Sequence, residues 1–132
     1  MSEEEIKSQI SKTDEKIKKA TGKKATLMRT PGGSFNSEVK QSIEKPLILW
    51  SIDTRDWETR SCEKTVNAVM KDVKDGDIVL MHDIYGSTRD AACILIVKLR
   101  QEGYQLVTVS ELAKYRGYTL KKGNIYYSLR RK

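Results

Sequence analysis

The chain contains a single histidine, His82, which directly follows the apolar segment from Ile78 to Met81. An imidazole can take up and release a proton near neutral pH, so a histidine at the mouth of an apolar site is a candidate general acid. A nearby carboxylate would stabilise the imidazolium form that such an acid requires. Asp56 is the candidate carboxylate, because it also follows an apolar run, from Leu47 to Ile52.

A third reactive group follows another predicted strand. The segment from Arg29 to Gly33 ends the first strand, the segment from Asp53 to Trp57 the second, and His82-Asp83 the third. In parallel α/β folds, functional groups collect in the loops after the carboxyl ends of the strands. We therefore expect these three loops to be neighbours and to form one site.

Alternating helix and strand patterns must position these loops. The spacing predicts helices over 3–20, after the caps Asn36, Ser61 and Thr88, and from Ser110, and strands over 26–29, 47–52, 78–81 and 105–109. Four βα units after a leading helix predict an α/β fold with parallel strands. A small open sheet and part of a β/α barrel both remain open, and a complete barrel needs about 200 residues or more.

The composition excludes several classes of protein. A length of 132 residues with 38% hydrophobic residues fits one soluble domain. The longest apolar stretch, 91–99, is too short to span a membrane, and the acidic N-terminus has no export signal. Cys62 and Cys93 are too few for a disulfide framework and form no C-x-x-C pair.

The net charge of +7 is concentrated at the C-terminus. Residues 114–132 hold seven basic residues, no acidic ones and four of the six tyrosines, which are Tyr115, Tyr118, Tyr126 and Tyr127. Basic residues interleaved with aromatic ones can follow phosphates and stack on bases. We favour a terminal extension whose charges are solvated, which makes nucleic acid an unlikely partner.

Three of these segments together resemble a known family. Arg29-Thr30-Pro31-Gly32-Gly33, Asp53-x-x-Asp56-Trp57 and Leu80-Met81-His82-Asp83 are similar, in order and spacing, to the last three of five motifs of the polysaccharide deacetylases, the NodB-like carbohydrate esterase family four. The similarity continues through Glu102 to Leu112. It implies a partial deacetylase domain over 1–113, resembling the C-terminal half of a distorted (β/α) barrel, and a basic tyrosine-containing tail over 114–132.

The resemblance implies a chemistry for each matching residue. Members of this family use a divalent metal such as zinc to remove acetyl groups from amino-sugar polymers of the peptidoglycan or chitin type. By this resemblance His82 is the general acid, Asp56 its charge partner, and Arg29 orients the catalytic base. Trp57 and Leu80 shape the acetyl pocket, and Gly32 lies in the substrate groove, where the family commonly has an aromatic residue.

The first two motifs of the family do not occur in this sequence. They supply an Asp-Asp pair and two histidines for the base and the metal, whereas this chain has no Asp-Asp pair and one histidine. We therefore predict no metal ligands in this chain, and no activity of the chain by itself.

Three hypotheses follow for function. The first is an inactive deacetylase fragment, and the second is a half-barrel completed by a missing N-terminal half or by a second copy. The third is a binding module whose basic tail contacts nucleic acid or an anionic polymer. Members of the family usually act outside the cell or at its surface, so the absence of an export signal in this chain leaves the location open.

Overall fold

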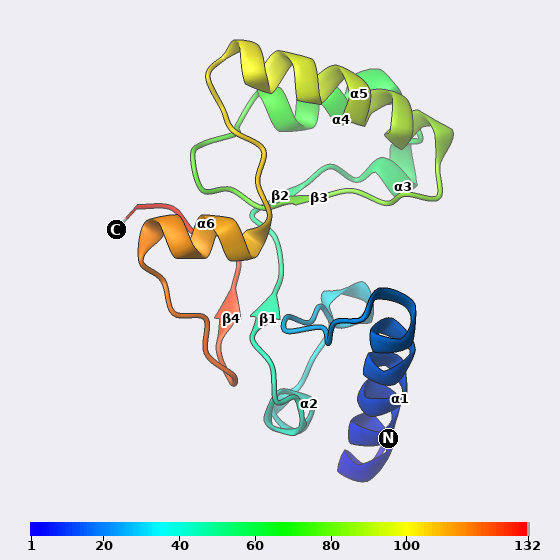
Figure 1. Cartoon of the computed structure of the whole chain (residues 1–132). Coiled ribbons are helices and arrows are strands. Elements are labelled where there is room, and N and C mark those ends of the chain that lie inside the picture. Colours follow the sequence, from blue (N-terminus) through cyan, green and yellow to red (C-terminus); the bar gives the residue numbers. More distant parts are fainter. Residues whose placement is uncertain (132) are drawn as a thin grey trace. The chain divides into compact units, whose positions relative to one another are not determined.

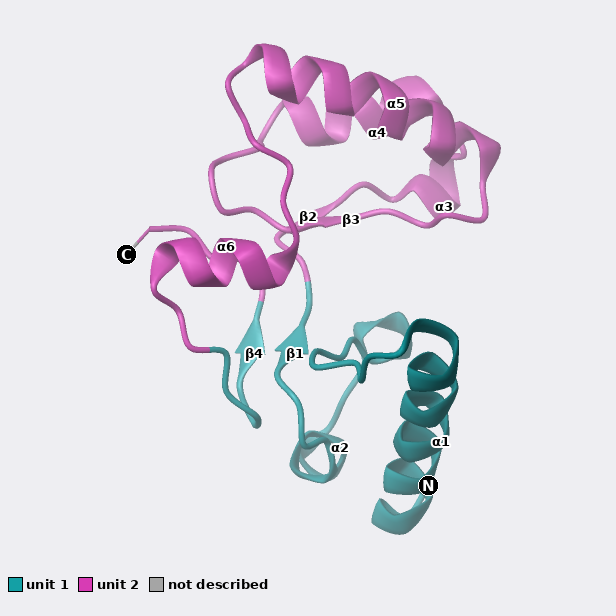
Figure 2. Ribbon diagram, in the orientation of Figure 1, with its two compact units in different colours: residues 1–49, 120–126 teal, residues 50–119, 127–132 magenta. Residues whose placement is uncertain are grey.

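The computed structural model describes residues 1–131, which divide into two compact units (Figures 1 and 2). Unit 1 comprises residues 1–49 and 120–126, and unit 2 comprises residues 50–119 and the C-terminal residues from 127 on. The segment that the sequence separates as a tail, 114–132, therefore contributes residues to both units.

The helices of unit 1 begin and end close to their predicted limits. Helix α1 spans Glu3–Thr21, where Ser2 and Glu5 form a capping box at the start and Gly22 closes the end in the left-handed conformation. The turn after Arg29 is a short 3-10 helix, η1, at Pro31–Gly33. Helix α2 follows at Ser37–Ser42, and the Asn36 side chain caps it by accepting from the Val39 N–H.

The strands of unit 1 are parallel and short. Strand β1 (Leu47–Ile48) pairs with β4 (Ile125–Tyr126), and Met28 forms a single parallel bridge with Leu47 on the other side of β1. The residues of β1 are almost completely buried, as expected for a strand with neighbours on both sides. Strand β4 lies in the predicted tail, so part of that segment belongs to the fold of unit 1.

Unit 2 contains the other helices and a second parallel pair of strands. Helices α4 (Cys62–Met70) and α5 (Gly86–Gln101) pack together beside β2 (Ile52–Asp53) and β3 (Val79–Leu80) (Figure 1). Helices α3 (Asp56–Thr59) and α6 (Val109–Arg116) complete the unit. Its core consists of Ile52, Val66, Val69, Ala91, Leu95 and Leu99. None of the helices in residues 1–131 combines the length and the apolar character that crossing a bilayer requires.

A buried carboxylate holds the C-terminal segment in unit 2. The Asp77 side chain is only 1% exposed, and it accepts hydrogen bonds from the Ser51 hydroxyl, the Lys74 N–H and the Arg130 guanidinium at 2.7–2.9 Å. The Leu129 N–H donates to the Gly76 carbonyl at 2.8 Å, and the Leu129 side chain is completely buried. Leu129 is therefore part of the interior of unit 2.

One predicted strand is divided in the structure. The sequence predicts a single strand over 47–52, but β1 ends at Ile48 and β2 begins at Ile52. The hydrogen-bonding partner changes between them: the Leu49 N–H donates to Tyr126, whereas the Ser51 N–H donates to Ile78. The prediction of one strand was therefore wrong. A continuous apolar run in the sequence indicates that the segment is buried, but it does not indicate where the neighbouring strand changes.

Three further predictions need correction. The strand predicted over 26–29 is only the single bridge at Met28. No strand forms over 105–109, where within residues 1–131 the backbone has no ladder partner, and Leu106 and Val107 are about half exposed. Thr88 is not the cap of α5, because that helix begins earlier, at Gly86. Propensity alone cannot form a strand whose N–H and C=O groups have no neighbour.

We predict that Gly76→Ala strongly destabilises the protein. The backbone of Gly76 has φ +93°, and a Cβ there would lie 2.6 Å from backbone atoms of Leu129 and Arg130. The backbone strain and the clash should together reduce the free energy of unfolding by about 3 kcal/mol or more, measured by urea denaturation.

Gly103→Ala is the matched control, because φ there is +87° but no atom lies within 4 Å of the added Cβ. It should cost only the backbone strain, about 1 kcal/mol. Equal losses for the two variants would show that the close approach at Gly76 does not limit the fold.

Candidate active site

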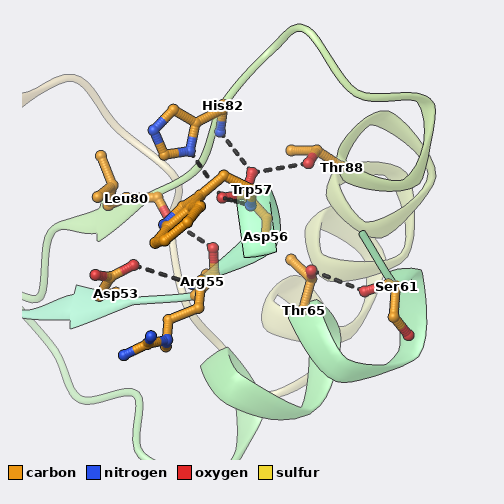
Figure 3. Close-up of polar contacts among 10 residues, drawn as sticks. Asp53, Arg55, Asp56, Trp57, Ser61, Thr65, Leu80, His82 and Thr88 are labelled. Carbon is orange, nitrogen blue, oxygen red and sulfur yellow. Dashed lines mark hydrogen bonds and ion pairs between the residues drawn. The ribbon is translucent and has the colours of Figure 1, made fainter. Parts of the chain in front are cut away.

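Strands β2 and β3 bring Asp56 and His82 together. The two strands are parallel neighbours with Asp53 opposite Leu80, so the segments that follow them leave the same edge. The Nδ1 atom of His82 lies 2.8 Å from Oδ1 of Asp56 (Figure 3). The pairing that the sequence analysis expects between these two side chains is therefore present.

The turn between β2 and α3 delivers the Asp56 carboxylate. The Asp53 side chain accepts from the Arg55 N–H at 3.0 Å, which closes a turn directly after the strand. Arg55 then takes the left-handed conformation, with φ 51° and ψ 33°, and Asp56 begins α3. A non-glycine residue in this region is strained, and such strain is common beside functional groups.

The Asp56 carboxylate is completely buried and fully hydrogen bonded. Its Oδ2 accepts from the His82 backbone N–H at 2.6 Å and from the Thr88 hydroxyl at 2.7 Å. Its Oδ1 accepts from the Trp57 N–H at 3.0 Å and faces the His82 ring. Burial alone would raise the pKa of Asp56, but the hydrogen bonds from His82 and Thr88 outweigh it and hold the pKa below its ordinary value.

The geometry determines which nitrogen of His82 can exchange a proton with a ligand. Because the Asp56 carboxylate is ionised and only accepts, Nδ1 carries the hydrogen of the shared bond. The His82 side chain is 39% exposed, and no hydrogen bond from residues 1–131 reaches its Nε2. This nitrogen is therefore the one that can donate to a bound molecule.

Trp57 and Leu80 lie within two residues of the pair in sequence and differ in exposure. Trp57 follows Asp56 in α3 and is 47% exposed, with the Arg55 guanidinium 6.0 Å from its ring centre. The Leu80 side chain is largely buried in β3, and its carbonyl accepts from the Thr54 hydroxyl at 2.8 Å. That hydrogen bond connects the end of β3 to the turn that carries Asp56.

Arg29 and Gly32 lie in unit 1. The Arg29 guanidinium donates to the carbonyls of Ile48 and Leu49 at 2.9 and 3.0 Å, and burial lowers the pKa of Arg29. Gly32 lies within η1 with φ 63°, so the turn uses the left-handed conformation that glycine adopts without strain. Both residues thus occupy the loop that follows Met28.

The sequence does not indicate Thr88 as a member of this site. It predicts Thr88 as the cap of a helix, whereas the hydroxyl binds Asp56, 32 positions away. The sequence does show a hydroxyl group in the first helical turn after His82. Only the packing of α5 shows that this hydroxyl donates to Asp56.

The donor groups do not fit a divalent metal. In the part of the chain that the structure describes, no three side chains of His, Cys, Asp or Glu are grouped so that they could hold an ion. Asp56 is buried under four donors, and its carboxylate has no free lone pair for a metal.

We predict that Asp56→Asn destabilises the protein at neutral pH by about 2–4 kcal/mol, since the amide nitrogen would face N–H and O–H donors in the interior. The folded pKa of Asp56 lies below the unfolded value. The stabilisation is therefore fully present above the unfolded value of about 4 and is lost as the pH falls through the folded value.

Urea unfolding of both proteins across pH 2 to 7 measures this difference, which should shrink in acid. Asp83→Asn is the control, because Asp83 is exposed beside His82 and its change should stay within about 0.5 kcal/mol. A difference between wild type and Asp56→Asn that does not depend on pH would contradict the assignment.

We also predict that Arg55→Gly is more stable than Arg55→Ala by about 1 kcal/mol, because only glycine adopts the observed φ without strain. Both variants lose the ion pair with Glu58, so their comparison isolates the backbone. Thermal unfolding of the pair decides the point, and an alanine variant at least as stable would exclude strain at Arg55.

Comparison with known proteins relates most of the chain to one family. A family model described as polysaccharide deacetylase matches residues 1–46. The chain is 41% identical over 112 residues to the peptidoglycan-N-acetylmuramic acid deacetylase PdaC of Bacillus subtilis, covering 85% of this chain and 24% of PdaC. It is 38% identical over 126 residues to the peptidoglycan-N-acetylglucosamine deacetylase PgdA of Listeria monocytogenes, covering 96% of this chain and 26% of PgdA.

The fold agrees with this relationship. The structure of a family 4 acetyl xylan esterase from Clostridium thermocellum, in complex with a cobalt ion, superposes with a TM-score of 0.91 at 27% identity. The match covers 97% of this chain and 65% of the esterase chain. This chain spans about a quarter of the length of PdaC and PgdA. It belongs to the polysaccharide deacetylase family, also called carbohydrate esterase family 4.

Proposed function

We propose that this chain supplies the general acid of a deacetylase that removes acetyl groups from amino-sugar polymers of the peptidoglycan or chitin type. The observation that carries the proposal is the pair formed by the buried Asp56 carboxylate and the partly exposed His82 ring, 2.8 Å apart. The substrate class is supported by PdaC and PgdA, which are both named as peptidoglycan deacetylases. In this proposal the motifs of the family lie within residues 1–113.

The proposed step is the protonation of the leaving amine. When the carbon–nitrogen bond of the acetamide breaks, its electron pair moves to nitrogen, and an amine anion is too basic to leave unprotonated. The imidazolium of His82 donates its Nε2 proton to that nitrogen and becomes neutral imidazole. The buried Asp56 carboxylate remains ionised and accepts the hydrogen of Nδ1 throughout the transfer.

The neighbouring residues would serve binding and orientation. Trp57 and Leu80 would form the apolar surface for the acetyl methyl group, and the half-exposed indole of Trp57 is accessible for such a contact. Gly32 would lie in the substrate groove, where it has no side chain to form a wall. Arg29, whose guanidinium is held by two backbone carbonyls, would orient the catalytic base.

The water-activating half of the site would come from another polypeptide segment. A metal-bound water is the usual nucleophile when a divalent ion assists hydrolysis, and residues 1–131 hold no group of donors for such an ion. We therefore propose that the chain by itself does not turn over substrate. Either a separate N-terminal half or a second copy would pack against it. Only the N-terminal half would bring the Asp-Asp pair and the two histidines, because a second copy contains neither.

The third hypothesis, a basic binding module, is less favoured by the contacts of the tail. Arg116 forms an ion pair with Asp75, and Arg130 forms one with Asp77. These two tail charges are already used inside unit 2, which leaves fewer for nucleic acid or an anionic polymer.

A chimera tests the function. This chain would replace the matching region of PdaC, and acetate release from N-acetylated chitooligosaccharides would be measured. His82→Asn should reduce the rate by about 10²- to 10⁴-fold, because asparagine can still donate to Asp56 but has no Nε2 proton to transfer. Cys93→Ser, an exposed change on α5, is the control and should retain the rate.

Two outcomes would refute the proposal. An active chimera whose rate is unchanged by His82→Asn would exclude His82 as the acid. Stoichiometric zinc together with acetate release by the isolated chain would show that it holds a complete site.

A further inference from the structure

We infer that Thr88 is a positioning residue for the acid, holding the Asp56 carboxylate in the rotation that presents Oδ1 to the His82 ring. The inference rests on the proposed function for its catalytic meaning, but the positioning itself concerns only contacts within unit 2. It assigns a role to the first turn of α5 that neither the spacing of the motifs nor the pair itself reveals.

The contacts of Oδ2 fix the carboxylate. This oxygen receives the His82 backbone N–H at 2.6 Å and the Thr88 hydroxyl at 2.7 Å, and both Asp56 and Thr88 are buried. The carboxylate only accepts, so the Thr88 hydroxyl must donate. With both donors on one oxygen, rotation of the carboxylate would break two hydrogen bonds at a buried position.

Thr88 differs from three other threonines in helices. Thr13, Thr21 and Thr65 each donate to the carbonyl four residues earlier, which is the usual local bond of a helical threonine. The Thr88 hydroxyl instead reaches a residue of another element (Figure 3). This hydroxyl therefore serves the site and not its own helix.

The position in α5 strengthens the contact. Thr88 is the third residue of α5, whose first turn contains no acidic side chain and whose N-cap has no side-chain hydrogen bond. The Asp56 carboxylate thus lies at the positive end of a helix of 16 residues. The dipole and the hydroxyl both favour an ionised carboxylate at this point.

The consequence is a fixed tautomer of His82. A carboxylate oxygen directed at Nδ1 selects the neutral form with hydrogen on Nδ1, so that Nε2 faces the exposed side. Without the hydrogen bond from Thr88 to Oδ2, the carboxylate could rotate, and the preference of His82 for the Nδ1–H tautomer would weaken. Thr88 would thereby act on the reaction through Asp56 and His82 without touching substrate.

The test is the tautomer ratio of the single histidine, read from ¹⁵N chemical shifts of the ring in the full chain at a pH where the ring is neutral. Wild type should show predominantly the Nδ1–H form. Thr88→Val, which keeps the branched shape but removes the hydroxyl, should lower the ratio of Nδ1–H to Nε2–H by roughly twofold to tenfold, the effect of one hydrogen bond. Thr88→Ser should restore the wild-type ratio.

Thr65→Val is the matched control, since Thr65 is equally buried in unit 2 but its hydroxyl donates to Ser61. It should change stability without changing the ratio. If Thr88→Val has the wild-type ratio, or if Thr65→Val shifts it as much, the positioning role is overturned. A shifted ratio combined with a chimera that is insensitive to His82→Asn would uphold the positioning and refute only the proposed function.

Discussion

The Asp56 carboxylate lies in the interior of unit 2 with no exposed surface, so the surrounding structure has to supply its hydrogen-bond donors. An ionised group without water is costly unless donors replace the water. Two of its donors are backbone N–H groups, of Trp57 and His82, and two are side chains, the His82 ring and the Thr88 hydroxyl. Those donors come from three successive segments, so the charge can be buried only when all three are in place.

The parallel pairing of β2 and β3 is what makes this possible. The register sets Asp53 opposite Leu80, and the Thr54 hydroxyl donates to the Leu80 carbonyl immediately beyond it. The strained conformation of Arg55 then turns the chain so that the next side chain points inward. The core between α4 and α5 supplies the apolar burial that offsets the strain.

A second buried carboxylate has a different purpose in the same unit. Asp77 is also shielded from solvent, but its partners are Ser51, Lys74 and Arg130, and it anchors the C-terminal segment. Asp56 instead contacts the ring of His82. Both carboxylates have a partly exposed partner, but the imidazole can take up and release a proton near neutral pH and the guanidinium cannot, which separates the candidate catalytic group from the structural one.

The sequence by itself determined the helices with clear caps, the parallel character of the strands and the pairing of Asp56 with His82, because these depend on local spacing and on motif order. Only the tertiary structure decided where the run over 47–52 divides, that 105–109 forms no strand, and that β4 lies in the tail. Each of these depends on which backbone lies alongside, which no local pattern records. The role of Thr88 also became visible only there, since its partner is 32 positions away and is reached through the packing of α5.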